Sequence, residues 1–188
     1  MSNASPLSRP EYGGSVLELM AVVLITAILA AGAMPMLYEQ VAVRQIDSVA
    51  RRFIAHAQFA RGQALALGVS VQIAPLQGNL WDEGWLVSIQ CPKGKLLVDC
   101  VDRPWLSQGV IAPVYFKGGG RQFIDPHLGN RGIAFNAAGA AKTAHGGFVA
   151  NRLILGHERH PQLERQLILG RGGRWRICDP RKDAKSCS

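Results

Sequence analysis

The sequence lacks the residue groupings on which enzymes and metal proteins depend. No nucleophile stands in a recognisable arrangement with a base, so we expect neither an enzyme nor a bound cofactor. None of the four cysteines has zinc-ribbon spacing, which argues against a structural metal. The stretch 157–160 (His-Glu-Arg-His) contains residue types that can bind a metal. However, Pro161 follows and a third ligand is missing, so we predict an exposed loop. The glycines at 118–120 precede no helix and also predict a surface loop.

Charge is absent from Leu19 to Tyr38, a run of 20 residues. As a helix rising about 1.5 Å per residue, this run is long enough to cross the apolar core of a bilayer. Glu18 stands at its N-terminal edge, and a carboxylate there is costly unless a partner meets it. Pro35 removes a backbone donor and predicts a kink in the helix rather than its end.

Two simpler interpretations of this segment remain open. A secretory signal peptide would have a shorter apolar region followed by a small-residue cleavage site. Residues 30–33 (Ala-Ala-Gly-Ala) offer such a site, but the apolar run continues past it and the acid precedes the run. The second interpretation is a simple membrane anchor in which Glu18 has no role.

The helical pattern continues beyond the apolar run, with charged residues largely on the opposite face. We therefore predict one helix of about 50 residues, amphipathic over residues 39–68 and ending at Gly68. The charged face, including Arg51 and Arg52, is expected to be solvated or to contact another subunit. The apolar positions recur at spacings of three and four: Ile46, Val49, Ala50, Phe53, Ala57, Ala60, Ala64 and Leu67.

After Gly68 the pattern changes to the alternation of strands, with Gly and Pro between them. A long helix followed only by strands predicts an α+β fold, with the helix packed on antiparallel sheet. The expected strands lie around Val69–Ile73, Trp85–Ile89, Leu96–Val98, Val110–Ile111, Ile133–Phe135, Phe148, Arg152–Leu155, Leu167–Leu169 and Trp175–Cys178.

The N-terminal pattern of glycine, apolar residues, glutamate and apolar helix resembles the class III signal of type IV pilins and pseudopilins. The resemblance implies that residues 1–13 are a leader, cut by prepilin peptidase between Gly13 and Gly14, with methylation of the new terminus. Glu18 is then the fifth mature residue and Pro35 the twenty-second. Residues 14–38 would span the bacterial inner membrane once, with the head in the periplasm, and later form the filament core. There Glu18 would meet the terminal ammonium of a neighbouring pilin.

Three further segments resemble the GspH/FimT branch of these proteins. They are residues 59–68 (Phe-Ala-Arg-Gly-Gln-Ala-Leu-Ala-Leu-Gly), 81–87 (Trp-Asp-Glu-Gly-Trp-Leu-Val) and 133–139 (Ile-Ala-Phe-Asn-Ala-Ala-Gly). The resemblance implies a pilin-like fold in which residues 69–188 form a β-rich head, and a minor pilin or pseudopilin rather than a bulk subunit.

The oxidising compartment beyond the inner membrane permits disulfides. Four cysteines allow three pairings, and the sequence does not decide among them. The short spans favour Cys91 with Cys100 and Cys178 with Cys187.

The C-terminal segment is strongly basic in a chain of formal net charge +8. Six Lys or Arg against two Asp give residues 171–188 a net charge of +4. Residues 173–176 (Gly-Arg-Trp-Arg) match the Gly-Arg-x-Arg motif of FimT-like minor pilins, in which it is implicated in DNA binding during natural transformation. The residues expected at such a surface are Arg171, Gly173, Arg174, Arg176, Arg181, Lys182 and Lys185.

Physical chemistry supports the same expectation. On a strand, Arg174 and Arg176 share one face, about 6 to 7 Å apart, which is close to the phosphate repeat of one DNA strand. Arginine binds phosphate through paired donors, and contacts to phosphates alone give binding without sequence preference. Trp175 points to the other face and should pack into the core. Alternatively, the basic tail is only a solubilising edge that prevents strand pairing.

The sequence therefore predicts a FimT-like minor type IV pilin that joins other minor and major pilins in a pilus at the cell surface. It would bind double-stranded DNA for uptake. The alternatives are a structural GspH-like pseudopilin of type II secretion and an initiator of pilus assembly without DNA binding.

Overall fold

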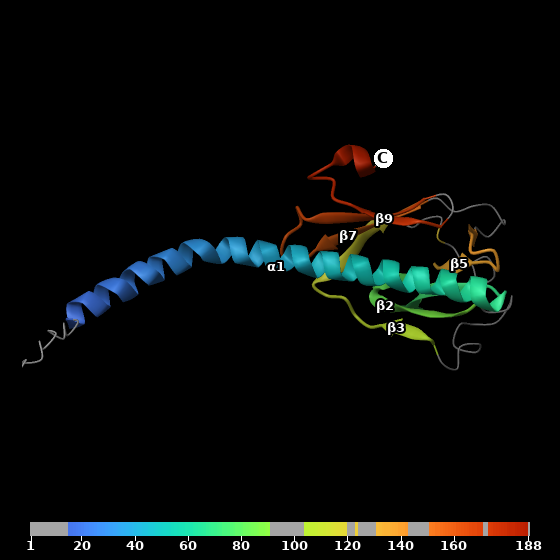
Figure 1. The fold of residues 1–188 in the computed structure, drawn as a ribbon, viewed down its shortest axis with the longest axis horizontal. Coiled ribbons are helices and arrows are strands. Elements are labelled where there is room, and N and C mark those ends of the chain that lie inside the picture. The colour runs from blue at the N-terminus through green and yellow to red at the C-terminus, as the bar shows by residue number, and fades with distance from the viewer. Residues whose placement is uncertain are drawn as a thin grey trace, which may run out of the picture. The chain divides into compact units, whose positions relative to one another are not determined.

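The computed structural model describes residues 15–90, 104–119, 123, 131–142, 151–170 and 173–187. Within these residues one long helix comes first, followed by strands and a short 3-10 helix (Figure 1). The elements are α1 (Val16–Leu67), β1 (Val71–Gln77), β2 (Leu80–Ile89), β3 (Leu106–Gln108), β4 (Val114–Gly119), β5 (Ile133–Phe135), β6 (Ala141–Lys142), β7 (Asn151–His157), β8 (Glu164–Leu169), β9 (Trp175–Cys178) and η1 (Ala184–Cys187).

The chain divides into two compact units, residues 1–39 and 40–188. In the first unit the described side chains of α1 are almost all exposed, and nearly all are apolar. This part of α1 is long and apolar enough to cross a membrane. Ser15 caps its start, since the Ser15 Oγ accepts a hydrogen bond from the Leu17 N–H at 3.3 Å. α1 runs through Pro35 without a break, and a kink there stays a prediction.

The second half of α1 buries one face, as its apolar spacing predicted. Ala42, Ile46, Ala50 and Phe53 are buried, and Ala57, Ala60 and Ala64 extend this row. Leu67 was expected on this face but is 52% exposed, because the last turn passes beyond the core. Gly68 ends the helix in the left-handed conformation, at φ +68°, and its N–H donates to the Ala64 carbonyl at 3.0 Å.

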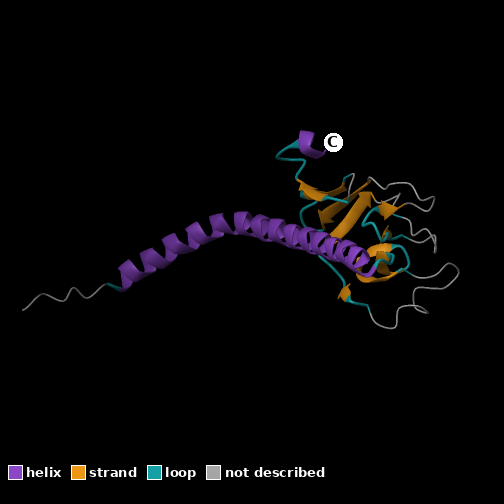
Figure 2. Ribbon diagram, turned by 45° about the vertical axis from the view of Figure 1, so that its right-hand side comes forward, coloured by secondary structure: helices purple, strands orange, loops and turns teal. Residues whose placement is uncertain are grey.

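The strands form two antiparallel sheets. One has five strands in the order β3-β2-β1-β5-β6, and the other has four in the order β4-β7-β8-β9. Figure 2 shows the strands gathered along the second half of α1. The predicted α+β arrangement of a long helix on antiparallel sheet is confirmed.

Phe53 joins the helix to both sheets. Its ring lies 5.1 Å from Trp85 of β2 and 5.7 Å from Trp175 of β9, between ring centroids. Trp81 and Phe116 also pack against it in edge-on contacts. Edge-on aromatic pairs at such distances stabilise a core beyond the burial of their area. α1 therefore fixes where β9 runs, with β2 and β3 on one side of the helix and β7 and β9 on the other (Figure 1).

Several strand predictions need correction. Val110–Ile111 is not a strand, since the edge strand beside β2 is β3, which pairs Leu106 with Val87. Gly118 and Gly119 lie in β4, paired with β7 past a bulge, and not in a surface loop. The bulge shifts the register between Phe116 and Gly118, and the strand continues through the glycines. The expected strands at 96–98 and 148 lie outside the described residues.

His157 also departs from the prediction of an exposed loop. It ends β7 and is only 2% exposed. Its Nε2 lies 2.9 Å from the Gln45 Oε1 of α1, and its Nδ1 accepts the Arg159 N–H at 3.2 Å. These contacts hold the imidazole at the junction of α1 and the four-stranded sheet. Across the part of the chain that the structure describes, no group of three or more His, Cys, Asp or Glu is placed to hold a metal ion.

Candidate functional site

β9 is the outer strand of the four-stranded sheet, and it carries the predicted basic motif. Among the described strands it pairs with β8, placing Arg176 opposite Ile168 and Trp175 opposite Leu169. A tight turn leads into it, with the Gly173 N–H donating to the Gly170 carbonyl at 3.2 Å. This segment therefore lies at the edge of the sheet that the described strands form.

Exposure alternates from Arg174, just before β9, to Arg176 within it. Arg174 and Arg176 are exposed, whereas Trp175 is half-buried. The Trp175 ring packs against Phe53 and lies 6.0 Å from the Phe123 ring, between centroids. Anchored by the tryptophan between them, the two guanidinium groups are held on the solvent side of the edge strand.

A disulfide closes the segment that follows β9. It joins Cys178 to Cys187, with their Cα atoms 5.5 Å apart. Within this loop Asp179 organises a turn, since its Oδ1 accepts the Arg181 N–H at 3.1 Å. Arg181, Lys182 and Lys185 are all exposed. The closed loop thus keeps three basic side chains next to β9.

Arg165 of β8 ties this loop to the rest of the head. Its side chain is only 7% exposed and contacts two carboxylates, Asp47 of α1 at 2.7 Å and Asp179 at 2.9 Å. A buried guanidinium is stable only when its charge is compensated, so this arrangement fixes all three groups. Arg152 adds a second tie, donating to the Cys187 carbonyl at 3.2 Å.

The segment from Gly173 to Cys187 is basic. Its residues carry five Lys or Arg and two Asp, which gives +5 − 2 = +3. Asp179 shares the buried Arg165 with Asp47, whereas the five basic side chains are exposed. A net positive charge on exposed side chains favours the binding of an anion.

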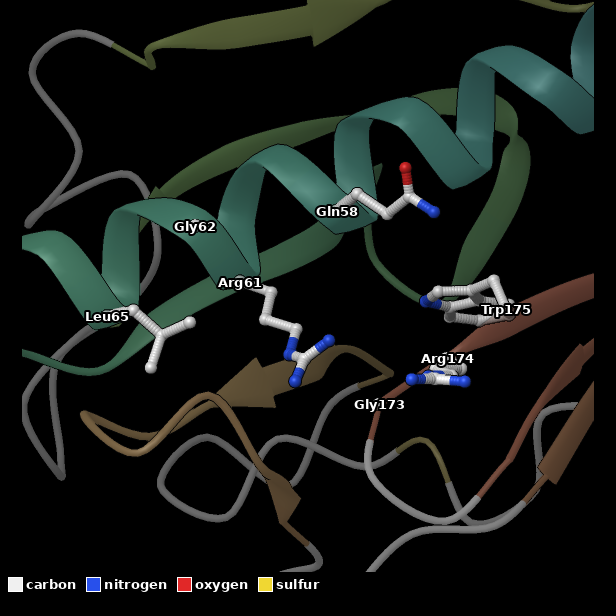
Figure 3. Close-up of a pocket in the computed structure, with 7 residues that line it drawn as sticks. All are labelled: Gln58, Arg61, Gly62, Leu65, Gly173, Arg174 and Trp175. Carbon is white, nitrogen blue, oxygen red and sulfur yellow. The ribbon is translucent and has the colours of Figure 1, made fainter.

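A cleft of about 490 Å³ opens beside this strand, between α1 and the start of β9. Gln58, Arg61, Gly62 and Leu65 line it from the helix, and Gly173, Arg174 and Trp175 line it from the other side (Figure 3). The Arg61 Nε donates to the Gly139 carbonyl at 2.9 Å, which directs the side chain toward Gly173. Two arginines from distant parts of the chain thus share one cleft.

The predicted site residues divide into described and undescribed ones. Gly13, Gly14, Arg171, Cys91 and Cys100 lie outside the described residues. Glu18 and Pro35 lie in α1. The others gather around β9 and its closed loop: Gly173, Arg174, Arg176, Arg181, Lys182, Lys185, Cys178 and Cys187.

Sequence reasoning missed Arg61, a charged residue in the amphipathic part of the helix. Gln58 and Leu65 lie three or four residues from Arg61 and Gly62 along α1. This spacing puts them on one face of α1, but only the fold brings Gly173 against it.

A model of the family described as "Type II transport protein GspH" matches residues 49–173. The chain belongs to the GspH family. The matched range covers the second half of α1, the strands from β1 to β8 and the turn that leads into β9. Family membership, together with the apolar helix, indicates a membrane-anchored pilin or pseudopilin that assembles with others of its kind.

Solved structures of a minor pilin and a minor pseudopilin share the fold of this GspH-family chain, which confirms the predicted pilin-like fold. The type IV minor pilin FimU of Pseudomonas aeruginosa has a TM-score of 0.53 at 17% identity, covering 77% of this chain and 96% of FimU. The minor pseudopilin EpsH of the type 2 secretion system of Vibrio cholerae has a TM-score of 0.50 at 9% identity, covering 72% of this chain and 98% of EpsH. No curated protein sequence matches the chain significantly.

Proposed function

We propose that this GspH-family chain is a minor type IV pilin whose C-terminal surface binds double-stranded DNA for uptake. The observation that carries the proposal is the exposure of Arg174, just before the edge strand β9, and of Arg176 within it, beside a disulfide-closed basic loop. Phosphate contacts from such groups need no particular base sequence, which suits the uptake of arbitrary DNA.

The geometry favours phosphate over other anions. Each guanidinium presents paired N–H donors that match two phosphate oxygens, and alternate residues of a strand repeat every 6 to 7 Å or so. Arg181, Lys182 and Lys185 extend the cationic surface beyond the strand. A backbone of evenly spaced phosphates fits this row better than a small isolated anion does.

The N-terminal half of the chain has its own part in the proposal. Prepilin peptidase cuts after Gly13, and the mature helix holds the subunit in the inner membrane until assembly. Glu18 lies in the first turn of α1, where it meets the terminal ammonium of a neighbouring subunit in the filament. The subunit then carries the basic surface into the pilus.

A structural pseudopilin of type II secretion is the second candidate. The observation that favours it is the family match itself, because the model is described by a type II transport protein. In that case the basic edge serves solubility and binds no ligand. An initiator of pilus assembly without DNA binding would behave in the same way in a DNA titration.

The test is a titration of labelled duplex DNA with the full chain in neutral detergent micelles, at several salt concentrations. We expect the logarithm of the binding constant to fall linearly with the logarithm of the salt concentration, with a slope of about 0.9 per phosphate contacted. The Arg174→Gln/Arg176→Gln variant should lose most of the affinity and lower the slope by about two. Both substitutions are at exposed positions, so the fold should be retained.

Charge alone is controlled by an Arg44→Gln/Arg51→Gln variant, which removes the same charge from exposed positions of α1. If the wild type does not bind DNA, or if both double variants bind it equally, the DNA proposal fails. The structural pseudopilin is then the better interpretation.

A further inference from the structure

We propose that the cleft between α1 and β9 holds one phosphate of the DNA backbone, and that Arg61 of α1 is a DNA-binding residue. This inference rests on the proposed function and extends it to a residue outside the C-terminal motif. It gives the helix a direct part in binding, beyond its part in the core.

The cleft has the charge of an anion site. Arg61 and Arg174 both line it, and none of the described lining residues is acidic. Neither guanidinium takes part in the ion pairs among the described residues, which involve Lys117 and Arg165. Two uncompensated cations beside one concave surface attract an anion more strongly than either does on a convex one.

One N–H group of Arg61 holds its side chain in position, which leaves the other N–H groups for a ligand. Its Nε–H, one of the five N–H groups of a guanidinium, donates to the Gly139 carbonyl. Its other N–H groups have no hydrogen-bond partner within the described part of the chain. The single bond to Gly139 holds the side chain in place, and Figure 3 shows the guanidinium turned into the space between α1 and Gly173.

Gly173 makes this position possible. A Cβ atom built on Gly173 would lie 3.0 Å from the Arg61 Nε and 3.3 Å from its Cδ and Cζ. The backbone at Gly173 also has φ +75°, which L side chains rarely adopt. The glycine of the motif therefore lets the helix arginine approach the strand arginine.

The other lining residues suit a nucleotide unit. Leu65 and the Trp175 ring give the cleft apolar walls on either side of the cations. The sugar of a DNA backbone is less polar than its phosphate, so a wall of this kind can contact it while the guanidinium groups bind the phosphate oxygens. Gln58 lies one turn before Arg61 and adds an amide at the mouth of the cleft.

The test compares two pairs of variants of the full chain in the same duplex titration. Arg61→Gln should lower the affinity by about tenfold and the salt slope by about one. Its control, Arg51→Gln, removes the same charge from an exposed position of α1 outside the cleft and should leave the slope unchanged.

A second pair of variants leaves the hydrogen bond between Arg61 and the Gly139 carbonyl intact. Gln58→Arg adds a guanidinium at the cleft, whereas Ala55→Arg adds one at an exposed position of α1 that does not line it. Gln58→Arg should bind DNA more tightly than Ala55→Arg and raise the slope by about one. Thermal unfolding of each variant shows whether the head is intact.

The outcomes separate this inference from the proposed function. If each cleft variant behaves like its control while Arg174→Gln/Arg176→Gln still loses binding, the cleft assignment is overturned and the proposed function stands. Failure of the wild type to bind DNA overturns both. A third arm replaces chloride with inorganic phosphate at equal ionic strength. Extra release of DNA by phosphate from the wild type, but not from Arg61→Gln, would show that inorganic phosphate and the DNA backbone compete for the cleft, as the inference requires. Equal release from both would contradict it.

Discussion

Single side chains join parts of this protein that are far apart in the sequence. Arg165 bridges Asp47 of the helix and Asp179 of the C-terminal loop, and it does so while buried. Removing one partner of a buried ion pair leaves the other charge uncompensated, which costs more than the pair contributes. The basic loop is therefore stabilised by a residue that itself stays out of contact with solvent.

His157 makes a similar connection, and it is sensitive to pH. Burial lowers the pKa of His157 below its ordinary value, and the nearby His160 lowers this pKa further. Its Nδ1 accepts the Arg159 N–H, which requires the neutral imidazole. The unfolded chain binds a proton here below about pH 6.5, but the folded chain does so only at lower pH. The stabilising contribution is thus complete above about pH 6.5 and is lost as the pH falls through the lowered pKa.

We expect the free energy of unfolding of the head to fall between pH 7 and pH 5. His157→Gln should make this fall smaller, because glutamine takes up no proton in this pH range. Urea unfolding at pH 7, 6 and 5, followed by tryptophan fluorescence, measures the effect. Burial also lowers the pKa of His56, so the variant should keep part of the pH dependence. An identical pH profile in the variant would contradict the role of His157.

At the scale of elements, the disulfide between Cys178 and Cys187 determines how well the basic loop is ordered. A loop of this length restricts the unfolded chain by about 2 to 3 kcal/mol in the entropic model. The ties through Arg165 and Arg152 remain when the disulfide is absent. We therefore expect the loop to loosen while the sheets and α1 stay folded.

The Cys178→Ser/Cys187→Ser variant should bind DNA about threefold to tenfold more weakly than the wild type, and its thermal unfolding should move down by several degrees. The matched control is Cys91→Ser/Cys100→Ser, which leaves the C-terminal loop closed. Thiol counting on the unfolded variants confirms which cysteines remain paired. Equal weakening in both variants would show that the C-terminal disulfide has no special part in binding.

Elements were predictable from the sequence where their period was regular. The spacing of Ile46, Ala50 and Phe53 indicates the buried face of α1, and the alternation around Trp85 indicates β2. β4 was missed because its two glycines suggested a loop, although a bulge carries the strand through them. Periodicity cannot reveal such a case, since the partner strand that supports the glycines lies some 35 residues further along the chain.

The candidate site was predictable only in part, for a related reason. Local sequence places Arg174 and Arg176 on one face of a strand. The contact of Arg61 with Gly139 spans 78 residues, and that of His157 with Gln45 spans 112. Contacts over such separations depend on the packing of α1 between two sheets, which a pattern within one element does not contain.

For the whole molecule, α1 combines two environments in one helix. Its first half is exposed and apolar, whereas its second half buries a face under the head. Glu18 stands in the first turn, at the N-terminal edge of the apolar half. Because an acid in that setting is costly without a partner, we expect it to act in assembly and not in anchoring.

Glu18→Ala should insert into the inner membrane normally and appear in sheared pili at about a tenth of the wild-type level or less. Membrane fractionation and immunoblotting of the pilus fraction measure the two steps separately. Glu39→Ala, which also removes one acid from α1, is the control for net charge. Normal incorporation of Glu18→Ala into pili would rule out the proposed charge pair.

The close approach of Arg61 to Gly173 has a consequence for how relatives of this protein diverge. A relative that replaces the glycine must both relieve a left-handed backbone and make room for the helix arginine. One substitution does not achieve both, so the glycine should change only together with the helix arginine, whereas the arginine can change alone. A motif search that demands Gly-Arg-x-Arg alone would then accept chains without the helix arginine. A search that also requires a basic residue at the matching turn of the long helix would select relatives with the same function more strictly.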